Sequence, residues 1–273
     1  MRYPITKLTS ASLAGLLIGW ALMIPVAARA DLVTMTLTGV GNSNSTPPGQ
    51  NTADGGYTYP YFFSVVDQTS SKYTNPSVAL ICDDYSDDVG FNESWTANTY
   101  SLQQAAGGSG QMQANTSLQA DGILNSTLTN QQAYWAAAYL FQQLVSYGLT
   151  PTSPTAAESE AFNVAIWGLF SNQAYTSNPS AFTNTYNLGT LGSMTVSALI
   201  NSAYTATKNG YSNTNIVFYT PTTPPNITNA CNGCSARPQE YIGIVPEPAS
   251  MFLLGIGLIG LFGIRRGSAR YRY

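Results

Sequence analysis

The sequence predicts an α+β domain with a mostly antiparallel β-sheet or barrel and a cluster of about three helices. Alternating apolar and polar residues occur at both ends of the central region, and helical periodicity fills its middle. Strands, then helices, then strands again favour an antiparallel sheet with segregated helices. Apolar runs at the two chain ends add a signal helix and a C-terminal transmembrane helix. We therefore divide the chain into residues 1–30, 31–244 and 245–273.

The first thirty residues have the order of a secretory signal peptide. Arg2 and Lys7 form a basic start, residues 13–26 are apolar, and Ala28-Arg29-Ala30 matches an A-x-A cleavage site. We expect signal peptidase to cut after Ala30. An uncleaved membrane anchor is the alternative interpretation.

Four strands are expected in the first part of the domain, at residues 32–40, 57–66, 77–83 and 94–102. The first alternates Val33, Met35 and Leu37 with threonines, which is typical of a half-buried strand. Pro60 interrupts the second, so an edge strand or a bulge is expected there. Residues 105–110 are rich in glycine and predict a break.

Three helices follow, at residues 131–147, 155–170 and 196–208, each with an apolar stripe of helical period. Asn130 is a candidate N-cap of the first helix. Thr155 and Glu158 have the spacing of a capping box that opens the second. Residues 215–220 and 239–245 predict two closing strands.

The tail begins with Pro246-Glu247-Pro248, which cannot be helical because each proline fixes its own φ and extends the preceding residue. Residues 249–264 are uncharged and apolar, and Arg265 and Arg266 end the run. At 1.5 Å per residue the run spans about 24 Å, short of the roughly 30 Å hydrocarbon core. The arginines are expected to stay cytoplasmic and to stop transfer.

This tail resembles the PEP-CTERM sorting signal that exosortases read in Gram-negative bacteria. The resemblance covers about the last thirty residues. It implies exosortase as a processing partner, transient membrane contact through the C-terminal helix, and a final place at the cell surface or in the extracellular matrix of a biofilm. It implies nothing about the activity of residues 31–244.

The composition of the region between the signals excludes several classes of function. Residues 31–245 carry three basic and twelve acidic residues, a formal net charge of −9, so nucleic acid is a poor partner. The chain has no histidine, which excludes His-dependent triads and His-ligated metal sites. We expect no enzyme and no resident cofactor. The many hydroxyl and amide side chains suit a polysaccharide matrix, which makes extracellular polysaccharide a candidate partner.

A cluster of acidic residues follows the third expected strand, namely Asp83, Asp84, Asp87 and Asp88. Their oxygen ligands could hold calcium, although the spacing does not match an EF-hand loop. The alternative is a solvated turn in which Asp83 or Asp84 caps backbone amides.

Two further features remain open at the level of sequence. Cys231 and Cys234 flank an Asn-Gly turn, and in an exported chain we expect them to form a disulfide. Several aromatic residues could stack on sugars, but packing in the core is the favoured interpretation; they are Tyr57, Tyr59, Tyr61, Phe62, Tyr85, Trp95 and Tyr100.

Cys82 is left unpaired if Cys231 and Cys234 are bonded, and alternation places it on the face of Val78 and Leu80, as a buried thiol. The segment around Cys82, together with Ala165-Ile166-Trp167, resembles thioester-domain surface adhesins. Those proteins join a cysteine to a glutamine in an internal thioester. This chain has Asn163 where the glutamine would stand. We expect Cys82 and Asn163 to lie near each other without forming a thioester.

These features together predict a non-catalytic structural or adhesive protein, exported and sorted by exosortase. The alternatives are a covalent adhesin with a thioester, and a surface module that binds calcium or carbohydrate.

Overall fold

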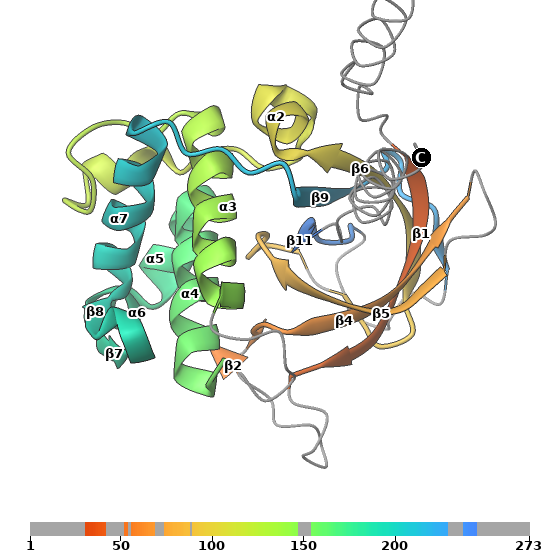
Figure 1. The fold of residues 1–273 in the computed structure, drawn as a ribbon, viewed down its shortest axis with the longest axis horizontal. Coiled ribbons are helices and arrows are strands. Elements are labelled where there is room, and N and C mark those ends of the chain that lie inside the picture. The colour runs from red at the N-terminus through yellow and green to blue at the C-terminus, as the bar shows by residue number, and fades with distance from the viewer. Residues whose placement is uncertain are drawn as a thin grey trace, which may run out of the picture.

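The computed structural model describes residues 31–41, 52–53, 56–68, 74–87, 89–146, 154–228 and 237–244. Its centre is a closed antiparallel barrel of six strands (Figure 1). The order around the barrel is β1 (Leu32–Val40), β4 (Tyr61–Asp67), β5 (Thr74–Cys82), β11 (Tyr241–Ile244), β9 (Ile216–Pro221) and β6 (Ser94–Ser101). Closure comes from β6, which pairs with both β9 and β1. The short β10 (Ile227–Thr228) pairs with β6 beside the end of β9.

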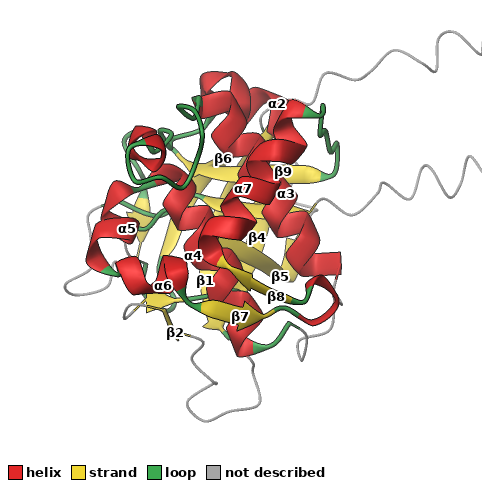
Figure 2. Cartoon of the chain, turned by 90° about the vertical axis from the view of Figure 1, so that its left-hand side faces the viewer, coloured by secondary structure: helices red, strands yellow, loops and turns green. Residues whose placement is uncertain are grey.

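A layer of helices covers one side of the barrel, as the view from that side shows (Figure 2). Its main members are α3 (Asn130–Ser146), α4 (Ala156–Phe170) and α7 (Val196–Lys208), which pack against one another. Shorter helices are α2 (Leu102–Gln104), α5 (Asn172–Ser177) and α6 (Pro179–Thr183), with helical turns η1 (Ala105–Ser109), η2 (Thr116–Gln119) and η3 (Gly189–Leu191). Two small hairpins pair β2 (Thr52–Ala53) with β3 (Gly56–Tyr57) and β7 (Thr185–Asn187) with β8 (Ser193–Thr195).

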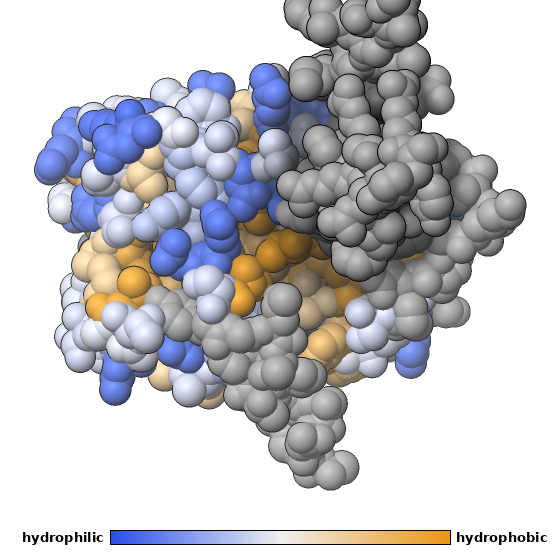
Figure 3. All heavy atoms as spheres, in the orientation of Figure 1, coloured by the Kyte–Doolittle hydropathy of each residue, from blue (hydrophilic) through white to orange (hydrophobic). Residues whose placement is uncertain are grey.

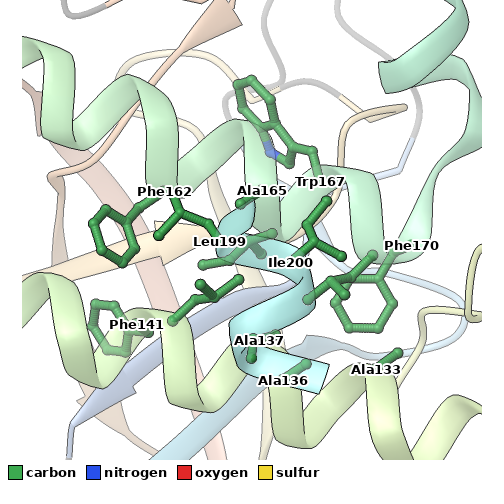
Figure 4. Close-up of a cluster of buried hydrophobic side chains, with 14 of the residues drawn as sticks. Ala133, Ala136, Ala137, Phe141, Phe162, Ala165, Trp167, Phe170, Leu199 and Ile200 are labelled. Carbon is green, nitrogen blue, oxygen red and sulfur yellow. The ribbon is translucent and has the colours of Figure 1, made fainter. Parts of the chain in front are cut away.

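Helix α4 is the centre of the helical layer. Every residue from Ala161 to Phe170 is buried, so this part of the helix is enclosed on all sides. The expected apolar stripe of Phe162, Ile166 and Leu169 is therefore only one part of its buried surface. Figure 4 shows how side chains of α3 and α7 meet those of α4. An apolar helix without a polar face needs such enclosure, because exposure of any side would place apolar surface in water.

The barrel has its own core, separate from that of the helical layer. Alternate residues of the strands point inward, and the largest are aromatic. The Phe63 ring packs edge-on against Tyr241 and Trp95, with ring centroids 4.6 and 5.6 Å apart. The opposite faces of β5, β9 and β11 contribute Ile81, Phe218 and Ile242 to the helical core. These three strands are therefore covered on both faces.

The expected α+β class is confirmed, and the expected strands and long helices occur with shifts of a few residues at their ends. Thr155 and Glu158 form the expected capping box of α4. The expected N-cap of α3 is wrong. Asn130 is the first helical residue, and the Thr129 hydroxyl instead accepts a hydrogen bond from the Gln132 backbone N–H at 3.2 Å.

The interpretation of residues 57–66 as one strand is also wrong. Strand β4 begins after Pro60, at Tyr61, and pairs on both sides, so it is not an edge strand. The alternative of a bulge has support, because the ladders of β4 with β1 and with β5 both shift register. Tyr59 lies in the helical core, edge-on to Phe141 with ring centroids 5.9 Å apart, whereas Tyr61 lies inside the barrel. Residues 105–110 do not simply break the chain, because η1 forms a helical turn there that directly follows α2.

The N-terminal signal helix and the C-terminal transmembrane helix are predictions for residues outside the described ranges. Within those ranges, no helix combines the length and the apolar character needed to cross a membrane.

Candidate functional site

A buried acidic network lies where the barrel meets the helical layer. Tyr241 of β11 pairs with Cys82 of β5, and both side chains lie in the barrel core. Their chain neighbours, Glu240 and Asp83, therefore meet on the opposite, helix-facing side, and the Asp83 N–H donates to the Glu240 carbonyl oxygen at 3.4 Å. Both carboxyl side chains have 0% exposure. The register of one strand pair thus brings two acidic residues together in the interior.

Glu240 accepts hydrogen bonds from three separate parts of the chain. The Tyr134 hydroxyl on α3 donates to Oε1 at 2.7 Å, and the Gln111 backbone N–H donates to Oε2 at 2.9 Å. The hydroxyl of Thr220 on β9 donates to Oε2 as well. Three donors of this kind are what an ionised carboxylate requires when it is removed from water.

Asp83 differs from Glu240, because neither of its carboxyl oxygens receives a hydrogen bond from an N–H or O–H donor in the described part of the chain. Burial raises the pKa of Asp83 well above its usual range, and the charges of Glu240 and Asp84 raise it further.

Asp84 holds the loop that follows β5. Its Oδ1 accepts the backbone N–H groups of Ser86 and Asp87 at 2.9 and 3.3 Å, the turn expected of an aspartate in this position. Gln239 braces the same loop, since its Nε2 donates to the carbonyl oxygens of Asp84, at 3.1 Å, and Asp87. Burial raises the pKa of Asp84 to about 7, because the bonds from Ser86 and Asp87 only partly offset the loss of hydration.

Two of the four carboxylates predicted to hold calcium, those of Asp83 and Asp84, have different surroundings in the structure. Asp83 faces Glu240, while Asp84 accepts backbone amides of its own loop. The described residues contain no group of three or more acidic or cysteine side chains that could hold a metal ion, and we assign no metal ligand among them. Asp88 lies outside the described residues, so calcium binding by the loop as a whole stays a prediction.

Cys82 and Asn163 are neighbours. Asn163 Nδ2 donates to the Cys82 carbonyl oxygen at 3.0 Å, and its Oδ1 accepts the Tyr59 backbone N–H at 2.9 Å. The Cys82 thiol points into the barrel core and donates to the Asp84 carbonyl oxygen at 3.0 Å. Burial raises the pKa of Cys82 well above its usual range, and Asp84 and Asp83 add to the rise, so the thiolate is disfavoured.

Several other predicted site residues lie outside the described ranges. These are Ala28 and Ala30, Cys231 and Cys234, Pro246, Glu247 and Pro248, and Arg265 and Arg266. The Cys231–Cys234 disulfide stays a prediction. Among the aromatic candidates, core packing is confirmed for Tyr59, Tyr61 and Trp95, whose exposed fractions are 6, 3 and 1%.

A surface of aligned hydroxyl groups covers the outer face of β1 and its neighbours. One row across the strands is Ser64, Thr36, Ser94 and Thr228. The next row is Thr34, Thr96 and Thr222. We call these seven residues the hydroxyl face. All are half-buried or exposed, and none is charged.

Hydrogen bonds fix the direction of the hydroxyl groups on this face. The hydroxyls of Thr36 and Ser94 are 2.6 Å apart, and those of Thr96 and Thr222 are 2.7 Å apart. Gln68 Nε2 donates to the Thr34 hydroxyl at 2.7 Å. These bonds link β1 to β6 and join both strands to the residues that follow β4 and β9. A hydroxyl group can both donate and accept, so one bond does not use all of its bonding capacity.

Comparison with known proteins identifies the sorting signal. The PEP-CTERM protein-sorting motif matches residues 245–266. The chain is therefore an exported, exosortase-sorted extracellular protein that is anchored in the membrane only transiently. No curated protein and no solved structure matches the chain.

Sequence reasoning missed the role of Glu240 and Tyr134. Glu240 stands at the edge of a predicted strand, and Tyr134 belongs to a predicted apolar stripe, so neither pattern points to the other. Glu240 stands directly before a short apolar strand, where the chain enters the core. A buried glutamate needs a hydrogen-bond partner, so this position was a signal that a polar partner lies nearby.

Proposed function

We propose that residues 31–244 form a non-catalytic structural or adhesive domain of the cell surface or extracellular matrix, and that its partner there is a neutral polysaccharide. The hydroxyl face is the observation that carries the proposal. Its side chains both donate and accept hydrogen bonds, as the hydroxyl groups of sugars do. Its lack of charge matters, since a region with a net charge of −9 would repel an acidic polysaccharide.

The distribution of chemical groups supports a role without catalysis. The perturbed carboxyl groups and the thiol are enclosed, with exposed fractions of 0% for Asp83, Glu240 and Cys82 and 2% for Asp84. A substrate would have no access to them. In the view of Figure 3, the visible surface of the helical layer is mainly hydrophilic or intermediate in hydropathy.

Isosteric substitutions test this proposal in the full chain purified after export. Thr36→Val with Thr96→Val removes two hydroxyl groups from the centre of the face and keeps its shape. Thr176→Val with Thr205→Val is the matched control, because both threonines are exposed on helices away from the barrel. We expect an insoluble neutral glucan to retain the wild type and the control, and to retain the Thr36/Thr96 variant several-fold less.

Two outcomes would contradict the proposal in different ways. Equal retention of all three proteins would exclude the hydroxyl face as the contact surface. Failure of the wild type to bind both the glucan and the host's own matrix material would remove the adhesive role altogether.

A further inference from the structure

The first and last residues of the domain lie at the same end of the barrel. Strand β1 pairs antiparallel with β6, β6 with β9, and β9 with β11, so the chain direction alternates from each strand to the next. The start of β1, the end of β6, the start of β9 and the end of β11 therefore share one end of the barrel. We call this end, with Asp31, Ser101, Ile216 and Ile244, the exit rim.

Backbone hydrogen bonds hold both chain ends to the exit rim. The Thr99 N–H donates to the Asp31 carbonyl oxygen at 2.9 Å, and the Asp31 N–H donates to the Thr99 hydroxyl at 3.1 Å. Ile244 is the last residue of β11 and pairs with Ile216, and β11 itself lies between β5 and β9. The barrel wall therefore extends as far as Asp31 at one chain end and Ile244 at the other.

The two export signals begin very close to these ends. The sorting motif starts at Val245, and five peptide links separate Ile244 from Ala249, the first residue of the apolar run. A chain of this length spans at most about 18 Å. Five links also separate Asp31 from Val26, the last residue of the expected apolar signal run. A compact domain of this size has a radius of gyration of roughly 17 Å, so it is roughly 40 Å across. Both tethers are much shorter than the domain.

The part of the exit rim around β6, β9 and β11 carries no charged side chain. Residues 94–120, which include the end of β6, and residues 209–228, which include the loop into β9, contain no Asp, Glu, Lys or Arg. That loop exposes amide, hydroxyl and glycine groups, for example at Asn209, Ser212 and Thr214. The carboxylates of the rim, Asp31 and Asp67, lie at β1 and β4. An anionic lipid surface would repel carboxylates, so the uncharged part is suited to approach it.

We propose that the exit rim faces the membrane while the tail is anchored, and that the short tether holds the rim beside the lipid headgroups. The hydrocarbon boundary then lies within about 18 Å of Ile244, and the headgroup layer occupies roughly 5–7 Å of that distance. Ser94 and Thr228 of the hydroxyl face lie away from the lipid, because they are about 23 Å along β6 from Ser101. The anchored protein therefore presents these hydroxyl groups to the matrix before its tail is processed.

The test measures how close two points of the domain lie to lipid. Protein that retains its tail is prepared from cells without exosortase and placed in vesicles of phosphatidylethanolamine and phosphatidylglycerol with a nitroxide quencher on the headgroups. A fluorophore is attached at Ser212→Cys, beside the exit rim, or at Asn226→Cys, beside β10 at the other end of the barrel. Both residues are exposed. Cys231→Ser and Cys234→Ser remove competing thiols, and Cys82 is enclosed with 0% exposure.

We expect the lipid to quench the label at residue 212 several-fold more strongly than the label at residue 226. The control variant has a spacer of twenty Gly and Ser residues between Ile244 and Val245. Such a spacer has a mean reach of roughly 25 Å, so the difference between the two labels should disappear. Gln103→Cys, exposed on α2 just after the end of β6, is a second rim position with the same expected result.

Equal quenching at the rim and at residue 226 in the protein without the spacer would overturn the proposal. Stronger quenching at residue 226 would do the same. Quenching at residue 212 that the spacer leaves unchanged would also overturn it, because the short tether would not be the cause. The test contains no polysaccharide, so its result is independent of the proposed adhesive role.

Discussion

The side-chain amide of Asn163 joins helix α4 to the end of β5, by donating to the carbonyl oxygen of Cys82 at 3.0 Å. Its oxygen accepts the backbone N–H of Tyr59 at 2.9 Å, so one side chain satisfies two backbone groups of the barrel–helix junction. Asn163 has 0% exposure. Asn163 thus serves as a buried brace between α4 and the end of β5.

Asn163→Ala should destabilise the domain strongly, because it leaves the Cys82 carbonyl and the Tyr59 N–H without partners in a dry site. We expect a loss of about 1–3 kcal/mol for each orphaned group, measured by denaturant unfolding. Asn172→Ala, at an exposed position of α5, should change stability by less than about 0.5 kcal/mol. Equal effects of the two substitutions would show that Asn163 does not brace the junction.

The same contact predicts that no thioester forms. The thiol points into the barrel core and the amide bonds backbone groups, so sulfur and carboxamide are engaged elsewhere. A misplacement of about 1 Å in a reacting geometry can reduce a rate on the order of a hundredfold. We expect the intact mass of the reduced protein to show no loss of ammonia, and methylamine to add no mass at residue 163. An adduct that Cys82→Ala abolishes would establish the covalent adhesin instead.

Gly168 allows the close approach of α4 to its neighbours. A Cβ atom at this position would lie 2.6 Å from Cε1 of Phe182 and 3.2 Å from Cδ1 of Ile200. Gly168→Ala should therefore cost about 1–3 kcal/mol, since the packed helices must separate. Gly107→Ala is the matched control, because a Cβ there would meet nothing within 4 Å. If both variants unfold at the same denaturant concentration as the wild type, the helical layer is looser than the structure indicates.

Local patterns predicted most of the fold. The alternation of Val33, Met35 and Leu37 defines β1, and the Thr155–Glu158 capping box marks the start of α4. Both signals depend on residues within one turn or one strand. The start of β4 at Tyr61 rather than Tyr57 was not predicted, because alternation continues in sequence through Pro60 while the chain changes sides between Tyr59 and Tyr61.

The acidic network could be predicted only in part. The cluster at Asp83 and Asp84 is visible in the sequence, but its partner Glu240 is more than 150 residues away. The pairing of Tyr241 with Cys82 determines that contact, and strand register between distant segments has no local signature. For the same reason, the hydroxyl face exists only once β1, β6 and β10 are aligned.

The intact mass of the protein recovered from the extracellular fraction tests the central claim, that this is an exported domain released by processing of its PEP-CTERM tail. We predict a mature chain that starts at Asp31 and ends at or near Pro246-Glu247-Pro248. Deleting Arg265 and Arg266 should let the tail segment slip through the membrane, because these charges hold its orientation. Mature protein that still carries residues 1–30 or residues 249–273, in a host with exosortase, would contradict the account.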